Sequence, residues 1–213
     1  FHWGHKKWRI VSQSSPTGTQ CLEAVGTAMG AVKEGTDEVV YVSSGEGSTS
    51  EGEFHEAINW AARERLPVIF LIQDNKFAIS VTKKEQTAAR SVYDLTSGYE
   101  GLNRYEVDGC NFLDTYATAA DAVAKARRGE GPALILAHTV RLYTFAGGAD
   151  RRAPLRRRGT RLASGFRSQQ SRIGHDPEIV RRRVDTTPPH LPAARGVAFL
   201  RERSRIRPRR GRA

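Results

Sequence analysis

The sequence predicts an α/β fold in which a parallel sheet is flanked by helices. Between residues 19 and 144, short apolar runs alternate with helical patterns, which is typical of βαβ units. The apolar runs are continuous, as expected for strands that are covered on both faces. Two of these runs are introduced by Pro67 and Pro132. With 213 residues, the chain is long enough for one domain with a hydrophobic core.

The first half of this domain is expected to contain two helices with one strand between them. The first helix covers about residues 19–33 and includes Gly26 and Gly30, whose low helix propensity suggests close packing against another backbone. Residues 39–42 form the first strand. The second helix covers about residues 53–64 and has an apolar stripe with helical spacing. The stripe consists of Phe54, Ala57, Ile58 and Ala61.

The second half is expected to add three strands and one helix. Strands are predicted at residues 68–72, 105–108 and 133–137. The helix begins after Asn111, whose side chain is suited to cap the first turn. Its expected apolar stripe consists of Phe112, Tyr116, Ala119, Ala120 and Val123.

The net charge of +11 is concentrated in the last third of the chain. Residues 1–144 contain 15 Lys+Arg and 18 Asp+Glu, whereas residues 145–213 contain 19 Arg, no Lys and 5 acidic residues. Because the second segment lacks helical or strand periodicity, we expect a domain at residues 1–144 and an Arg-rich tail at residues 145–213. The abrupt change of composition favours a tail that is translated out of frame. A disordered basic tail and a nucleic-acid-binding arm are the alternatives.

Composition also limits the cellular setting. Cys21 and Cys110 are the only cysteines, too few for a disulfide framework, which favours a reducing, cytoplasmic environment. Cys110 is expected to be a small buried residue. No run of about 18 apolar residues predicts a membrane span, and the N-terminus lacks the pattern of a signal peptide. Because the chain begins without Met, we expect that an upstream portion is missing.

The clearest chemical signal is the glycine-rich segment GEGSTSEGE at residues 45–53, where a strand ends and a helix begins. Glycines allow close approach of a ligand, and the N–H groups at the start of a helix favour a phosphate. Glu46 offers a carboxylate oxygen for the Mg²⁺ that a bound phosphate normally needs. Asn75 ends the next strand and is expected beside Glu46 at the same edge of the sheet. The structural alternative for Glu46 is an interaction with the helix dipole.

These residues lie in a segment that resembles a known cofactor motif. GEGSTSEGEFHEAINWAARERLPVIFLIQDNKFAIS is similar to the thiamine-diphosphate motif, which begins with G-D-G or G-E-G and ends near N-N about thirty residues later. Two further blocks, SQSSPTGTQCLEAVGTAMGA and EVDGCNFLDTYATAADAVAKARRGEGPALILAHTVR, resemble segments that precede and follow this motif in alpha subunits of 2-oxoacid dehydrogenases, particularly the branched-chain type. The resemblance covers about residues 1–144 and depends on three blocks in the right order.

The resemblance implies a set of cofactor and metal ligands. Glu46 and Asn75 correspond to side-chain ligands of Mg²⁺, and Phe77 would contribute its backbone carbonyl. The residues implied for contact with thiamine diphosphate are Thr17, Gly45, Gly47, Ser48 and Gln73. The residues implied around a structural K⁺ are Ser14, Pro16, Thr19 and Gln20. His2 resembles a catalytic histidine near the cofactor pocket.

The chain also departs from the family pattern. Asp74 replaces the first asparagine of the N-N pair, Gln73 stands where some relatives have an arginine for the diphosphate, and Thr17 stands where leucine is common. Phe145 occupies the position of a catalytic loop histidine, four residues after Arg141. The upstream Tyr-Arg pair that helps to hold the diphosphate is absent. These departures imply a weaker diphosphate contact and loss of the loop histidine in the present chain.

The resemblance implies the alpha part of an enzyme that decarboxylates a branched-chain 2-oxoacid and passes the acyl group to a lipoyl group. A beta subunit or a fused beta domain would complete the site, and a lipoyl-bearing acyltransferase would accept the acyl group, in a hetero-oligomer such as a heterotetramer. Alone, this chain is expected to be inactive. The alpha subunit of a pyruvate or acetoin dehydrogenase is the nearest alternative. An inactive cofactor-binding remnant and a basic-tailed nucleic-acid-binding module are alternatives from other classes.

Overall fold

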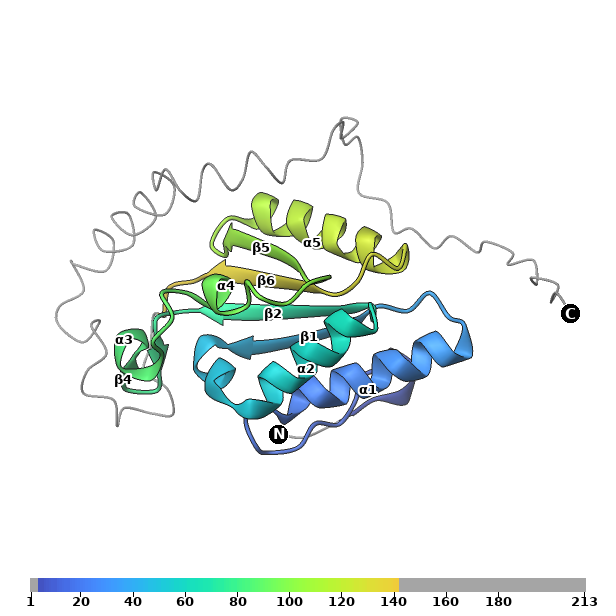
Figure 1. The fold of residues 1–213 in the computed structure, drawn as a ribbon, viewed down its shortest axis with the longest axis horizontal. Coiled ribbons are helices and arrows are strands. Elements are labelled where there is room, and N and C mark those ends of the chain that lie inside the picture. Colours follow the sequence, from blue (N-terminus) through green and yellow to red (C-terminus); the bar gives the residue numbers. More distant parts are fainter. Residues whose placement is uncertain (1–3, 142–213) are drawn as a thin grey trace, which may run out of the picture.

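A parallel sheet lies between two layers of helices in residues 4–141, the part of the chain that the computed structural model describes (Figure 1). The sheet contains β1 (Val40–Gly45), β2 (Val68–Asp74), β5 (Asn103–Asp108) and β6 (Ala133–His138), in the order β1-β2-β6-β5. Every neighbouring pair in this order is parallel. The predicted fold class and the four predicted strands are therefore confirmed.

Three long helices and several short elements accompany the sheet in this part of the chain. The long helices are α1 (Thr19–Glu34), α2 (Gly52–Arg63) and α5 (Phe112–Arg127). The short elements are the 3-10 helices η1 (Lys6–Trp8) and η2 (Glu46–Ser50), the helices α3 (Lys83–Gln86) and α4 (Val92–Leu95), and a hairpin of β3 (Phe77–Ala78) with β4 (Val81–Thr82).

The two faces of the sheet bury two separate apolar clusters, because successive side chains of a strand point to opposite faces. On one face, α1 and α2 cover the strand residues Val68, Phe70, Ile72, Leu134 and Leu136. On the other face, α5 covers Ile69, Tyr105, Val107, Ile135 and Ala137. Both faces of β2 and β6 are thus apolar, which explains why their sequences are continuous apolar runs.

The expected stripe of α2 is confirmed. Phe54, Ala57, Ile58 and Ala61 are each at most 1% exposed and belong to the cluster beneath α1 and α2. Burial of a side chain as large as Phe54 or Ile58 stabilises the fold by about 1.5 to 3 kcal/mol. This packing fixes α2, and with it the turn that precedes α2, against the ends of the strands.

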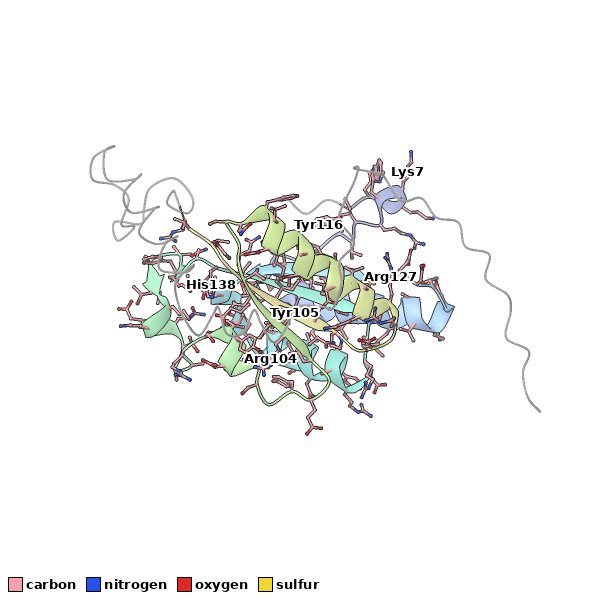
Figure 2. The ribbon with its side chains drawn as sticks, turned by 90° about the horizontal axis from the view of Figure 1, so that it is seen from above. Lys7, Arg104, Tyr105, Tyr116, Arg127 and His138 are labelled. Atoms are coloured by element: carbon pink, nitrogen blue, oxygen red, sulfur yellow. The ribbon has the colours of Figure 1, made fainter. Side chains whose placement is uncertain are left out.

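The expected stripe of α5 is wrong for Phe112, Tyr116 and Ala120, which are exposed, and right for Ala119 and Val123, which pack against the sheet. Asn111 caps this helix as predicted by accepting hydrogen bonds from the N–H groups of Leu113 and Asp114. Phe112 is 76% exposed and Tyr116 67% exposed, and Tyr116 points away from the sheet (Figure 2). The helix instead contacts the sheet through Ala122 and Ala126, with Ala119 and Val123 partly buried. Small side chains allow the helix axis to lie close to the sheet, and apolar spacing alone does not reveal this preference.

The expected close packing of Gly26 and Gly30 is also wrong within the described residues. A Cβ atom added at either glycine meets no atom within 4 Å, and both residues are exposed on α1. Neighbouring apolar side chains on this helix, Met29 and Val32, are 45% and 54% exposed. The glycines therefore lie on an open apolar face of α1.

Two phenylalanine substitutions test the assignment of Phe70 to the buried core and of Phe112 to the exposed face of α5. Phe70→Ala removes a fully buried side chain from the central strand β2, so we expect the free energy of unfolding to fall by about 3 to 5 kcal/mol. Phe112→Ala is the matched control and is expected to change it much less, because that ring is exposed. Urea unfolding of the two variants, followed by circular dichroism, measures both effects. Equal losses would contradict the assignment of the α5 face.

Candidate functional site

Parallel pairing brings the carboxyl ends of the strands to one edge of the sheet. Gly45, the last residue of β1, lies opposite Gln73 of β2. Asp74 and Asp108, the last residues of β2 and β5, both lie opposite His138 of β6. Ligands of open α/β sheets bind at this edge, beyond the carboxyl ends of the strands.

Glu46 directly follows β1 and is buried, with 2% of its surface exposed. Its Oε2 atom accepts a hydrogen bond from the backbone N–H of Asn75 at 3.2 Å, so the predicted proximity of these two residues is observed. Its Oε1 atom is buried and has no hydrogen-bond partner among the described residues. Burial raises the pKa of Glu46 above its ordinary value, while hydrogen bonds from the backbone of Glu46 and Asn75 act to lower it. A buried carboxylate oxygen without a partner is suited to a cation.

Asn75 occupies a tight turn between β2 and the β3–β4 hairpin. Its Oδ1 atom accepts a hydrogen bond from the N–H of Phe77 at 3.0 Å. Lys76, between them, has a φ of 73°, a left-handed conformation that is uncommon outside glycine, asparagine and aspartate. The turn keeps Asn75 and Phe77, two of the predicted Mg²⁺ ligands, within three residues of the buried Asp74 and close to Glu46.

The glycine-rich segment begins as a 3-10 turn, η2, before α2 starts at Gly52. A Cβ atom added to Gly47 would lie 2.8 Å from Cβ of Ala78, so the β3–β4 hairpin packs against this turn too closely for a larger residue. Gln86 of α3 donates hydrogen bonds to the carbonyl oxygens of Glu46 and Gly47. Ser48 is partly buried, and Gly45 faces open space.

The predicted K⁺ residues precede and begin α1. The Thr19 hydroxyl donates to Glu53 Oε2 at 2.6 Å, and Gln20 Nε2 donates to Ser44 Oγ at 3.4 Å. These bonds connect the start of α1 to α2 and β1. Ser14, Pro16, Thr17 and Gln73 are exposed, and His2 lies outside the described residues.

A network of charged side chains, which the sequence analysis missed, surrounds Asp74. This carboxylate is fully buried, and its Oδ2 atom accepts hydrogen bonds from Lys76 Nζ at 2.5 Å and Lys83 Nζ at 2.9 Å. Burial acts to raise the pKa of Asp74, but the charges and hydrogen bonds of Lys76 and Lys83 outweigh burial and hold the pKa below its ordinary value. A buried aspartate in place of asparagine requires cations nearby, and this requirement is the signal that could have identified Lys83.

His138 extends this network across the sheet to β5 (Figure 2). Its Nδ1 atom lies 2.9 Å from Lys76 Nζ, and its Nε2 atom lies 2.7 Å from Glu106 Oε1. Because a lysine ammonium can only donate, Nδ1 accepts and Nε2 carries the proton that is donated to Glu106. Three strand ends, those of β2, β5 and β6, are thereby joined by side-chain bonds.

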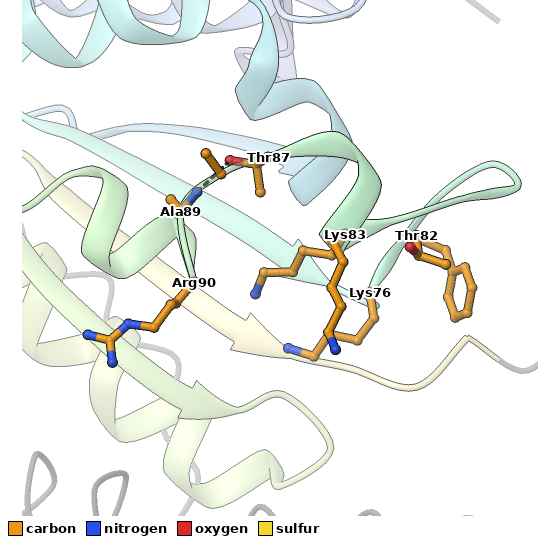
Figure 3. A pocket seen from close by; sticks show the side chains of 9 residues that line it. Lys76, Thr82, Lys83, Thr87, Ala89 and Arg90 are labelled. Carbon is orange, nitrogen blue, oxygen red and sulfur yellow. Dashed lines mark hydrogen bonds between the residues drawn. The ribbon is translucent and has the colours of Figure 1, made fainter.

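A pocket of about 830 Å³ adjoins this network (Figure 3). Its lining includes Lys76, Phe77, Thr82, Lys83, Lys84 and Arg90. The side chains of Lys76 and Lys83 converge there, where both bind Asp74. The pocket starts directly after Asn75 and is positively charged, so it belongs to the same edge of the sheet and favours anionic groups.

The cysteines differ in exposure. Cys21 is buried, and burial raises the pKa of its thiol to about 11. Cys110 is exposed, so its expected burial is wrong. It follows Gly109, whose N–H donates to the His138 carbonyl and keeps the turn after β5 at the rim of the sheet. Within residues 4–141, no helix is both long and apolar enough to cross a lipid bilayer.

Comparison with known proteins identifies the family of the chain. The fold is that of an α/β protein with a parallel sheet, a class in which ligands bind at the carboxyl edge, where Glu46 and the glycine turn lie. The family model described as "Dehydrogenase E1 component" matches residues 1–170. The chain belongs to the dehydrogenase E1 component family.

Curated relatives refine this similarity. The chain is 45% identical over 149 residues to "2-oxoisovalerate dehydrogenase subunit alpha" of Bacillus subtilis (strain 168), covering 70% of this chain and 45% of that protein. It is 47% identical over 129 residues to "3-methyl-2-oxobutanoate dehydrogenase subunit alpha" of Mycobacterium tuberculosis (strain CDC 1551 / Oshkosh), covering 61% and 35%. It is 37% identical over 134 residues to "Pyruvate dehydrogenase E1 component subunit alpha" of Bacillus subtilis (strain 168), also covering 61% and 35%. The chain thus spans less than half the length of these relatives.

The charged network gives a direct test of the site. Asp74→Asn leaves Lys76 and Lys83 side by side without the carboxylate that both bind. We expect the free energy of unfolding to fall by about 1 to 3 kcal/mol, less than for a fully buried pair because Lys76 reaches solvent. Glu130→Gln, which removes the acid of an exposed pair with Arg128, is the matched control and should have little effect. Guanidinium unfolding at constant pH compares the two. An unchanged stability of Asp74→Asn would show that the network is dispensable.

Proposed function

We propose that the carboxyl edge of the sheet binds thiamine diphosphate through Mg²⁺, and that this chain is the alpha part of a 2-oxoacid dehydrogenase. The observation that carries the proposal is the buried Glu46, whose Oε1 atom has no hydrogen-bond partner and whose Oε2 atom meets the N–H of Asn75. Membership of the dehydrogenase E1 component family supports it. When bound, thiamine diphosphate supplies a carbanion that attacks the 2-oxoacid and stabilises the charge released on decarboxylation.

The residues present fit an anchoring role. Glu46 and Asn75 would hold Mg²⁺ with their side-chain oxygens, and Phe77 with its carbonyl oxygen, a set of hard oxygen ligands that suits this ion. Gly45, Gly47 and Ser48 would carry the diphosphate, because the η2 turn lies at the start of α2, where N–H groups favour an anion. Gln73, which is exposed near the end of β2, would contribute an uncharged contact to the diphosphate.

The other implied residues remain part of the proposal. Thr17 would lie beside the thiazolium ring and His2 near the reacting carbon. Ser14, Pro16, Thr19 and Gln20 would surround a structural K⁺. The bonds of Thr19 to Glu53 and of Gln20 to Ser44 support an ordered segment here, because they join it to α2 and β1.

We propose a branched-chain 2-oxoacid as the substrate. The 2-oxoisovalerate relative is 45% identical over 149 residues, whereas the pyruvate relative is 37% identical over 134 residues. A beta subunit or fused beta domain would complete the site, and a lipoyl-bearing acyltransferase would accept the acyl group. One feature supports a partner: large apolar side chains are exposed on α1 and α5.

Calorimetric titration tests the cofactor site. Glu46→Gln keeps the shape of the side chain but removes the negative charge, so we expect Mg²⁺-dependent binding of thiamine diphosphate to weaken at least about tenfold. Glu51→Gln, an exposed acid five residues along, is the control and should bind as the parent chain does. Binding that is independent of Mg²⁺, or unaffected by Glu46→Gln, would reject the proposed metal ligands. If the parent chain does not bind thiamine diphosphate at all, the proposal that this chain alone anchors the cofactor is rejected.

We further propose that the cofactor domain ends near residue 144 and that residues 145–213 are translated out of frame. The charge distribution supports this, since 19 arginines and no lysine follow residue 144. Sequencing the coding DNA across the codons for residues 141–152, with translation in three frames, tests it. We expect another frame to continue into a loop with a histidine at the position of Phe145. A verified present frame without such a continuation would favour a natural basic tail.

A further inference from the structure

Gln86 makes a set of contacts that the proposed cofactor ligands do not explain. Its Nε2 atom lies 2.7 Å from the Gly47 carbonyl oxygen, 2.8 Å from Ser50 Oγ and 3.2 Å from the Glu46 carbonyl oxygen. All three acceptors belong to η2, which lies 36 to 40 residues earlier in the chain. One side chain of α3 thus contacts the turn that begins with Glu46 at several points.

The orientation of the Gln86 amide follows from these partners. The carbonyl oxygens of Glu46 and Gly47 can only accept, so Nε2 must face them and Oε1 must point elsewhere. The Oε1 atom is buried and has no hydrogen-bond partner among the described residues. Together with Glu46 Oε1, it is one of two such buried side-chain atoms in this part of the chain. The two unpaired oxygens therefore belong to Gln86 and to Glu46, whose backbone carbonyl accepts a hydrogen bond from Gln86.

The turn lacks caps of its own. No side chain caps η2 at Gly45, and none caps α2 at Glu51. Thr49 donates its hydroxyl to the Glu46 carbonyl, and Gln86 supplies the donors for Gly47 and Ser50. A segment that contains Gly45, Gly47 and Gly52 has large backbone freedom, so bonds from outside decide its conformation.

The helix that carries Gln86 is itself anchored to the neighbouring strand end. Thr82 and Glu85 form a capping box at the start of α3. Lys83 donates to Asp74, the residue before Asn75. Through Lys83 and Gln86, α3 therefore bonds to the ends of both β2 and β1, which carry the two proposed side-chain ligands of the cation.

We propose that Gln86 is a positioning residue that fixes the η2 turn, and thereby the buried carboxylate of Glu46, for the cation of the cofactor. This inference rests on the proposed function, because it concerns the same Mg²⁺ site. Gln86 acts through Glu46 and Gly47 and does not itself have to touch the ion.

The test compares four variants of the full chain by calorimetric titration of thiamine diphosphate at several Mg²⁺ concentrations. Gln86→Met keeps the length and most of the buried volume but removes the donor, and we expect about five- to twentyfold weaker binding at limiting Mg²⁺. High Mg²⁺ should restore binding in this variant but not in Glu46→Gln. Gln86→Glu turns carboxylate oxygens toward carbonyl oxygens and should weaken binding further. Glu130→Gln, which changes an exposed acid outside the site, is the control without effect.

Hydrogen exchange separates a local role from general destabilisation. Amides of residues 46–52 should exchange faster in Gln86→Met than in the parent chain, while those of β2 and β6 stay unchanged. If the parent chain binds the cofactor and Gln86→Met has the same Mg²⁺ dependence, the role of Gln86 is rejected and the cofactor site stands. If the parent chain shows no Mg²⁺-dependent binding, the proposed function fails and this inference with it. If the amides of β2 and β6 exchange faster in Gln86→Met to the same extent as those of residues 46–52, the substitution destabilises the whole domain and a positioning role is rejected.

Discussion

Parallel pairing of β1, β2, β6 and β5 is the constraint on which the rest of the structure depends. In register, this pairing puts Gly45 opposite Gln73 and both Asp74 and Asp108 opposite His138. The polar residues that follow the strands are consequently crowded at one edge, where the apolar clusters on the two faces of the sheet end. Buried polar atoms at such an edge must find partners, since an unpaired one costs about 1 to 3 kcal/mol.

The two buried carboxylates at this edge, Asp74 and Glu46, differ in how their oxygen atoms are paired. Around Asp74, two lysines and a histidine complete a network that reaches Glu106, so both oxygens of Asp74 and Oε1 of Glu106 have a nearby donor. At Glu46, one oxygen is bound by a backbone N–H and the other has no partner in the described residues. The first arrangement is closed and joins the strand ends, whereas the second leaves one carboxylate oxygen without a protein partner, where we propose that the cation binds.

Much of this organisation could be predicted from local sequence. Residues 68–72 and 133–137 form central strands because continuous apolar runs suit strands that are covered on both faces. The proximity of Glu46 and Asn75 followed from strand, turn, helix and strand in succession, because such a unit returns to the same edge. The face of α5 was predicted only in part: Ala119 and Val123 do pack against the sheet. Alanine and aromatic side chains both fit helical spacing, and only packing against the sheet selects Ala122 and Ala126.

The sequence by itself therefore determined the fold class, the strands and the two ends of the candidate site. Only the tertiary structure decided which side chains support that site. Lys83 and Gln86 act on residues 9 to 40 positions away, and His138 meets Lys76 across 62 positions. Apolar runs and turn residues act over short range and leave a pattern in the chain. A hydrogen bond between distant side chains leaves none, because its two atoms become neighbours only after the sheet has formed.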